Sequence, residues 1–194
     1  IALSSVVATA SIYVQRIILS NIGSIEDVGL YTAGLGIATQ YINIIFTSIS
    51  SDYSPRLSAV SHNKDEFIMM INRQMKMLVT IIAPLVLFFI IFIREITILL
   101  YSDKFLPISG MLEWVMFGMF FRATSWSISY ALIARGYAKS FFYNELATSV
   151  LSVVFSIVGY HYASFEGMGV GFCLSYILYT FQLYLVGKSS FQLR

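Results

Sequence analysis

Two arginines lie inside stretches of the sequence that are otherwise apolar, and their chemistry there is that of an anion-binding group. Arg122 is near the middle of one such stretch, and Arg16 is in the outer third of another. Charged side chains within hydrocarbon are costly, so they usually face a bundle interior or a water-filled cavity. An arginine can bind phosphate or carboxylate oxygens through two parallel hydrogen bonds. We therefore expect Arg16 and Arg122 to line a cavity that binds an anionic group.

Uncharged polar residues recur at helical spacing in the same stretches. Gln40 and Asn43 stand near the middle of a stretch that has no charge. Two amides at that depth exceed what one helix–helix contact needs, so we interpret both as cavity-lining residues. Similar stripes of serine and threonine accompany both arginines and a later stretch, and such stripes also mark close helix packing. The stripes contain Ser5, Thr9 and Tyr13, then Ser125 and Ser129, and finally Glu145, Thr148, Ser152 and Ser156.

The depth of each arginine decides which partner it needs. Arg16 could extend to the outer headgroups, because long basic side chains reach along apolar surfaces to water. Arg122 is too deep for that. It requires a carboxylate partner, for which Glu113 and Glu145 are candidates, or an anionic ligand.

The composition indicates a membrane environment for these residues. Hydrophobic residues make up 58% of the 194 residues and charged residues 11%, whereas soluble domains contain about 25% charged residues. The mean hydropathy is +0.78. A soluble globule of this composition would have an apolar, aggregating surface, so we expect an all-α integral membrane protein. One cysteine and a net charge of +2 exclude a disulfide scaffold and a strongly basic nucleic-acid-binding face.

Six apolar segments are long enough to cross a membrane as helices, which takes about 20 residues each. They lack the alternation of polar and apolar residues that strands of a membrane barrel show. Only the short turn of residues 163–166 separates the last two. The sequence therefore predicts a six-transmembrane-helix bundle, with helices at about 1–21, 29–51, 76–100, 110–134, 142–162 and 167–187.

The longest connection, residues 52–75, contains a helical pattern of its own. Asn63 followed by Glu66 resembles a helix-capping arrangement. Apolar residues then recur at helical spacing between charged ones, at Phe67, Ile71, Met75 and Leu78. This pattern favours an amphipathic helix on the cytoplasmic membrane surface, and the alternative is a plain connector.

Lysines and arginines predict the orientation, because cytoplasmic loops are enriched in them. The connections on one side contain only Arg94 and Lys104. The other side and the tail contain Arg56, Lys64, Arg73, Lys76, Arg135, Lys139, Lys188 and Arg194. We therefore expect both ends of the chain in the cytoplasm. The chain starts at Ile1 in an apolar stretch without the features of a signal peptide, so we expect it to be a fragment of a longer protein.

Patterns for catalysis or metal binding are weak. The two histidines, His62 and His161, fall on opposite sides of the membrane in this topology. The glycines of residues 167–171 open an apolar segment and follow no strand, so they predict close helix packing instead of a nucleotide-binding loop. We expect no enzyme activity, no cofactor and no metal.

Several short motifs follow one another along nearly the whole chain. They are Tyr13-Val14-Gln15-Arg16-Ile17-Ile18-Leu19-Ser20, Val28-Gly29-Leu30-Tyr31-Thr32-Ala33, Ser54-Pro55-Arg56-Leu57-Ser58, Ala83-Pro84-Leu85, Leu100-Tyr101-Ser102-Asp103-Lys104-Phe105, Ala134-Arg135-Gly136-Tyr137-Ala138-Lys139 and Glu166-Gly167-Met168-Gly169-Val170-Gly171. In this order, which is more specific than any one motif, they resemble the second half of Wzx-type O-antigen flippases, which belong to the MOP (multidrug/oligosaccharidyl-lipid/polysaccharide) exporter superfamily.

The resemblance implies the C-terminal six-helix lobe of a two-lobe, MATE-like transporter, whose partner is the N-terminal lobe of the same protein. Its substrate would be an undecaprenyl-pyrophosphate-linked oligosaccharide for surface polysaccharide such as O-antigen, moved across the bacterial inner membrane by alternating access. The family's cationic cavity implies roles for Arg16, Gln40 and Asn43, whereas Arg122 aligns with no motif. Relatives often carry an acid where this chain has Gln15, which argues against cation coupling there.

Two other functions stay open. A multidrug or cation antiporter of the same superfamily would be favoured by a carboxylate within the first two membrane helices, and none is present. A membrane polysaccharide polymerase or ligase would be expected to have a large outer loop with catalytic arginines, histidines or acids. The outer loops expected here are short and contain few charges.

Overall fold

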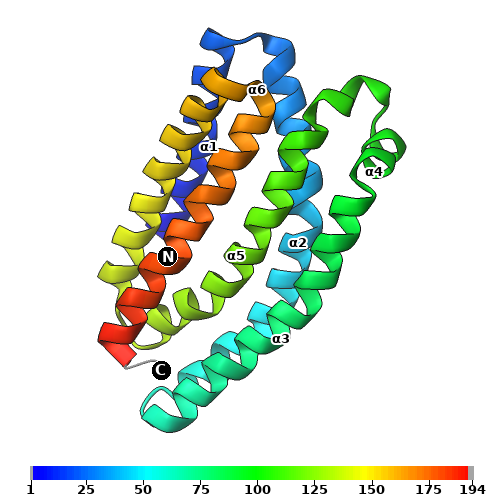
Figure 1. The fold of residues 1–194 in the computed structure, drawn as a ribbon. Coiled ribbons are helices and arrows are strands. Elements are labelled where there is room, and N and C mark those ends of the chain that lie inside the picture. The colour runs from blue at the N-terminus through cyan, green and yellow to red at the C-terminus, as the bar shows by residue number, and fades with distance from the viewer. Residues whose placement is uncertain (1, 192–194) are drawn as a thin grey trace.

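The computed structural model describes residues 2–191, and these are almost entirely helical (Figure 1). The all-α prediction is therefore confirmed for this part of the chain. Arg194, one of the residues that predict the orientation, lies outside it. The elements are α1 (Ala2–Ile22), α2 (Ile25–Ala59), α3 (Lys64–Ile91), α4 (Ile93–Leu100), the 3-10 helix η1 (Asp103–Ile108), α5 (Ser109–Ala134) and α6 (Ala138–Phe191).

Four helices among the described residues are long and apolar enough to cross a membrane. They are Leu3–Ile22, Lys64–Ile91, Asp103–Ala134 and Ala138–Lys188. The fourth is two helices in one, because α6 bends back on itself. α2 is not among the four, since glycines and the amides of Gln40 and Asn43 lower its hydropathy. The number of six crossings therefore stays a prediction.

The bend in α6 is at the predicted turn. Ala163 has φ −143° and ψ 28°, and Ser164 has φ 49° and ψ −132°, so neither residue is helical. The two halves of α6 run side by side beyond it (Figure 1). Gly159 and Gly167 face each other so closely that a Cβ on either would overlap the carbonyl oxygen of the other. The prediction that these glycines serve close helix packing is confirmed.

Most of the predicted connection 52–75 is helix, as the pattern after Asn63 favoured, but the helices extend further than predicted. α2 continues to Ala59 and α3 begins at Lys64, so only residues 60–63 connect them. The capping prediction is confirmed, since the Asn63 side chain accepts a hydrogen bond from the backbone N–H of Glu66. A capped start with acidic residues in the first turn favours helix. The chain then continues without a break into the membrane-length segment.

The apolar stripe of this segment packs inside the protein instead of on a membrane surface. Phe67, Ile71 and Leu78 are fully buried. Phe67 and Ile71 share a core cluster with Leu57 of α2 and Leu132 of α5. The predicted interfacial helix is therefore wrong: the stripe exists, but it meets other helices. The predicted third helix also differs, because it breaks at Phe92 between α3 and α4.

α5 is the central helix of the bundle. It packs against α6, α3 and α2, and in Figure 1 it crosses diagonally between α1 and α6 on one side and α2 and α3 on the other. Hydrogen bonds connect α5 to α2 and to α6. The Tyr53 hydroxyl of α2 donates to the Ser127 carbonyl over 3.2 Å. The Thr180 hydroxyl of α6 donates to the Phe121 carbonyl over 3.0 Å. Side chains near the middle of α5 are thereby held at the centre of the fold.

The turns that carry the predicted cytoplasmic charges lie at one end of the bundle. Figure 1 shows the α2–α3 turn, the α5–α6 turn and the C-terminal part of α6 together at its lower end. The α1–α2 turn and the bend in α6 lie at the upper end. The arrangement is the one that the distribution of lysines and arginines requires.

Candidate functional site

A cavity of about 410 Å³ lies between α1, α2, α5 and α6. Each of these helices contributes hydroxyl groups to its lining, and α5 and α6 each add one charged side chain. The residues that matter for its chemistry are Ser5, Ser54, Arg122, Ser129, Glu145 and Thr148. A cavity of this kind, with few charges among many hydroxyls, is suited to a polar ligand that carries charge at one point.

Arg122 on α5 is held in this cavity by aromatic rings instead of by an acid. Its guanidinium lies over the ring of Phe46, 5.6 Å from the centroid, and over that of Tyr176, at 5.8 Å. One nitrogen donates to the sulfur of Met119 over 3.6 Å. Arg122 forms no ion pair with any carboxylate that the structure describes. Cation–π contacts leave the N–H groups of the guanidinium unused, so several donors remain for a ligand.

Glu145 on the first half of α6 lines the same cavity. Its carboxylate accepts a hydrogen bond from the Tyr179 hydroxyl, and that hydroxyl lies 3.1 Å from Oγ of Ser129. Of the two predicted partners of Arg122, Glu145 is the one in the cavity, and it interacts with Arg122 electrostatically at longer range. Glu113 is exposed near the start of α5. The cavity thus contains a cation and an anion that are held apart by their own partners.

Arg16 is half-buried on α1 outside the lining of this cavity. Its guanidinium lies 5.6 Å from the centroid of the Tyr13 ring. Its Nε is buried and has no hydrogen-bond partner among the described residues. The predicted stripe on its face is exposed at Ser5, Thr9 and Tyr13, so Arg16 lies at the edge of a polar surface of α1.

The neighbouring Gln15 is the polar residue of α1 that faces the bundle interior. It is 4% exposed. Its amide nitrogen donates to Oγ of Ser152 on α6 over 3.1 Å, and its amide oxygen accepts from the Tyr31 hydroxyl of α2. One glutamine therefore connects three helices. Sequence reasoning noted Gln15 only as the place where relatives have an acid, and missed this contact.

Gln40 and Asn43 are exposed on the outer face of α2 and do not share the cavity with Arg122. Gln40 lines a separate, shallow hollow of about 310 Å³ together with Tyr101. The same face of α2 is polar along its length, because Thr47, Ser51 and Ser58 are exposed as well. The structure thus places the four predicted site residues at two locations: Arg122 in the internal cavity, and the others on open polar surfaces of α1 and α2.

Two tyrosines of the site were not predicted. Tyr176 and Tyr179 lie three residues apart on the second half of α6, so they share one face of that helix. Tyr176 packs against Arg122, and Tyr179 binds Glu145. Their spacing within an apolar segment was a signal that could have found them. Within residues 2–191 no group of three or more histidines, cysteines or acids could hold a metal ion.

Comparison with known proteins identifies a family for this chain. A family model described as "Polysaccharide biosynthesis protein" matches residues 1–110, which is more than half of the chain. The matched segment contains α1 to η1 and therefore includes Arg16, Gln40 and Asn43. No curated protein and no solved structure matches the chain.

Proposed function

Since the chain belongs to the polysaccharide biosynthesis protein family, we propose that it is one lobe of a flippase for lipid-linked oligosaccharides. The substrate is an undecaprenyl-pyrophosphate-linked oligosaccharide destined for surface polysaccharide, as in Wzx-type transporters. The lobe crosses the bacterial inner membrane six times with both ends in the cytoplasm, and it forms the C-terminal half of the transporter. The protein acts as a transporter and not as an enzyme.

The observation that carries this proposal is the state of Arg122. A guanidinium at the centre of an apolar bundle, without an ion-pair partner among the described residues, is unfavourable unless it faces water or a ligand. Arg122 lines a cavity rich in hydroxyl groups. A diphosphate supplies the oxygens that its free N–H groups can bind in pairs. The surrounding hydroxyls can donate to sugar oxygens and accept from sugar hydroxyls.

The physical need for such a site comes from the substrate. A pyrophosphate cannot enter hydrocarbon unaided, because an isolated buried anion loses far more hydration energy than thermal motion supplies. A cationic, wet path replaces part of that hydration, while the lipid tail stays in the bilayer. Rocking of one lobe against the other would open the path first to one side and then to the other.

The open polar faces of α1 and α2 support a second lobe as partner. Gln40 and Asn43 are exposed on α2, and the half-buried Arg16 lies at the edge of the exposed polar stripe of α1. Polar stripes turned towards lipid would be costly, whereas the same stripes would line a central path if the N-terminal lobe stood opposite. In this arrangement Arg16 provides a second cation along the path that Arg122 begins.

Glu145 favours one alternative function. A carboxylate in the cavity is the group that a drug or metal cation would bind, so cation antiport by the same superfamily is the second candidate. The two functions require opposite roles. In a flippase Arg122 binds the substrate and Glu145 opposes it, whereas in an antiporter Glu145 binds the substrate.

Replacement of Arg122 tests the proposal. In the full-length protein, Arg122→Ala should lower surface polysaccharide by at least about tenfold, the value of one lost charged hydrogen bond, with unchanged abundance in the membrane. Arg122→Lys should keep part of the activity, because lysine retains the charge but not the paired donors. Arg94→Ala, on the exposed face of α4, is the matched control. Normal polysaccharide in Arg122→Ala would overturn the proposal, and drug sensitivity instead of polysaccharide loss would favour antiport.

A further inference from the structure

A second hollow, distinct from the cavity of Arg122, lies between α2 and α3 near the turn that joins them. Its volume is about 560 Å³. α2 contributes Ile49 and Arg56 to its lining, and α3 contributes Arg73, Gln74 and Met77. This is the end of the bundle where the predicted cytoplasmic charges gather (Figure 1).

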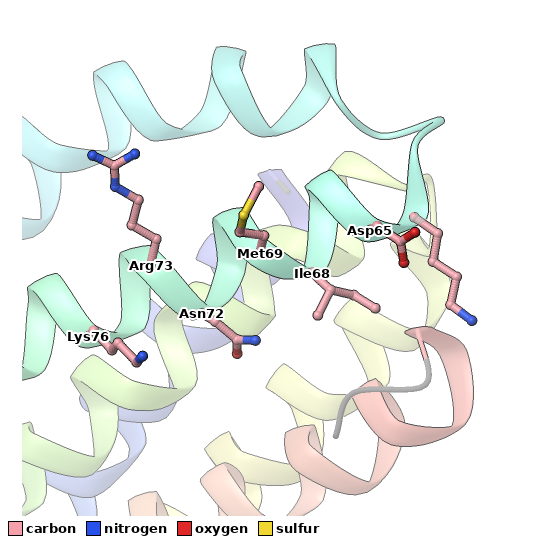
Figure 2. Close-up of a pocket in the computed structure, with 7 residues that line it drawn as sticks. Asp65, Ile68, Met69, Asn72, Arg73 and Lys76 are labelled. Atoms are coloured by element: carbon pink, nitrogen blue, oxygen red, sulfur yellow. The ribbon is translucent and has the colours of Figure 1, made fainter.

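The two arginines are available to an anion. Arg56 pairs with Asp52 at 3.2 Å, but both side chains are more than two-thirds exposed, and such exposed pairs contribute little. Arg73 forms no ion pair with a described carboxylate. Figure 2 shows the Arg73 side chain extending from α3 towards α2, on the same side as Met69, whereas Ile68 and Asn72 point the other way. The adjoining surface of α3 contains Lys64 and Lys76 beside the acid Asp65, so a net positive charge continues beyond the hollow.

Gln74 adds a buried amide to a lining whose one described carboxylate, Asp52, is paired with Arg56. Its amide nitrogen Nε2 is buried and has no hydrogen-bond partner among the described residues. A buried donor that is left unpaired is destabilising, so native proteins rarely keep one without a ligand or water. Gln74 lines the hollow together with Arg73 and the Arg56–Asp52 pair. The lining therefore has two guanidinium groups and one carboxylate, so it carries an excess positive charge.

The apolar part of the lining distinguishes a lipid from a free anion. Ile49, Met70 and Met77 line the hollow beside the donors. From Met77 onwards α3 exposes large apolar side chains along its length, including Ile81, Leu87 and Phe88. An acyl chain could leave the hollow along this surface, whereas inorganic phosphate would gain nothing from it.

We propose that the hollow between α2 and α3 binds the phosphate headgroup of an anionic phospholipid of the inner leaflet. Arg56 and Arg73 bind the phosphate oxygens, and Gln74 Nε2 donates to the phosphate or to the glycerol oxygens. The acyl chains lie against α3 from Met77 outwards. Bound lipid would fix the α2–α3 turn at the headgroup level and so set the depth of the lobe in the membrane. This site does not depend on which substrate passes through the cavity of Arg122.

Binding of defined lipids to the purified full-length protein tests the site. Native mass spectrometry in detergent would count bound phosphatidylglycerol, with phosphatidylethanolamine as the zwitterionic comparison. Arg56→Gln/Arg73→Gln should lower phosphatidylglycerol binding about a hundredfold, since each of the two lost charged hydrogen bonds weakens binding about tenfold. Gln74→Leu should lower it by a few-fold. Arg94→Gln/Lys104→Gln removes the same charge at the opposite end of the bundle and should leave binding unchanged.

Each result decides the proposal. Preference for phosphatidylglycerol that disappears only in the α2–α3 variants supports it. Equal binding of the two lipids, or an equal loss in the Arg94→Gln/Lys104→Gln control, overturns it. Displacement of the lipid by millimolar inorganic phosphate would also overturn it, in favour of a site for a soluble anion. Elution at the normal volume in size-exclusion chromatography separates loss of the site from loss of the fold. If the protein transports its substrate but shows no lipid preference, only this inference fails. If it prefers phosphatidylglycerol but transports nothing, only the proposed function fails.

Discussion

Gln15 and Ser152 connect the first described helix to the last one: Nε2 of Gln15 donates to Oγ of Ser152 over 3.1 Å, across 137 residues of sequence. Because the Gln15 oxygen accepts from Tyr31 as well, the amide uses a donor and an acceptor at once. A carboxylate at this position could only accept, so Ser152 and Tyr31 would both have to donate to it. Glutamine instead leaves the Ser152 hydroxyl proton free for another acceptor and places no charge in the contact.

Replacing Gln15 should destabilise the protein. Gln15→Leu removes both hydrogen bonds and leaves the buried hydroxyl groups of Ser152 and Tyr31 without this partner, so the free energy of unfolding should fall by about 1–3 kcal/mol. Thermal unfolding in detergent measures the change. Asn21→Ala is the control, since Asn21 is exposed and bonds only within its own helix. Equal melting temperatures for Gln15→Leu and the parent protein would contradict this prediction.

The contact of Gly159 with Gly167 should tolerate no side chain. Gly159→Ala or Gly167→Ala would place a methyl group on a backbone carbonyl that cannot move aside. Overpacking in a core costs about 1–3 kcal/mol, and we expect the upper end here because backbone is involved. The yield of monodisperse protein should fall sharply. Gly29→Ala is the matched control, because a Cβ there would meet nothing within 4 Å; a similar loss in that variant would refute the explanation.

The local structure of this chain could be predicted where one residue type determines it. Asn63 begins a helix, and the glycines of residues 167–171 mark close packing. The partner of an apolar stripe could not be predicted, because Phe67 and Ile71 would show the same spacing on a membrane surface as against α5. The sequence predicts where the apolar span ends, before Asp52 and Arg56. It does not predict where the helix ends, because a helix can continue beyond the hydrocarbon, as α2 does to Ala59.

The depth of a residue within an apolar segment could be predicted from the sequence, but the direction in which its side chain points could not. The depth of Arg122 predicts that it needs Glu113, Glu145 or an anionic ligand as partner, and the structure places Glu145 in the same cavity. Adjacent residues on a helix point about 100° apart, so depth alone could not show that Gln15, and not Arg16, faces the interior. Tyr176 and Tyr179 carry no charge, and their role depends on which helix packs opposite.

Arg16 should be needed for transport and not for folding. Its guanidinium lies over the ring of Tyr13, a residue of the same helix, so Arg16→Ala breaks no described hydrogen bond or ion pair between helices. In the full-length protein this variant should abolish surface polysaccharide while its membrane abundance stays normal. Arg16→Lys should be partly tolerated, because lysine keeps the charge without the planar fork of donors. Polysaccharide display on cells and immunoblots of membranes measure the two quantities; normal display in Arg16→Ala would remove Arg16 from the path.

Neutralising Glu145 should strengthen the binding of an anionic substrate. Glu145→Gln keeps an oxygen that can accept from the Tyr179 hydroxyl, so the local structure should persist. The variant removes the only negative charge among the described lining residues and leaves Arg122 unopposed. At the effective dielectric constant of partly buried sites, repulsion between the Glu145 carboxylate and a phosphate in the same cavity contributes about 1–3 kcal/mol. Affinity for an undecaprenyl pyrophosphate analogue should therefore rise about tenfold or more. Equilibrium binding to the purified full-length protein at fixed ionic strength measures this.

The controls for Glu145 use residues of the same type in other surroundings. Glu113→Gln removes an exposed acid from α5 and should leave the affinity unchanged, because solvent screens its charge. Glu145→Gln/Arg122→Gln should lose the gain, since no cation then remains in the described lining to attract the phosphates. Weaker binding of the analogue by Glu145→Gln would contradict the role of Glu145 as a competitor. If Glu145→Gln abolished cation export instead, Glu145 would be the group that binds the substrate, and the lobe would belong to an antiporter.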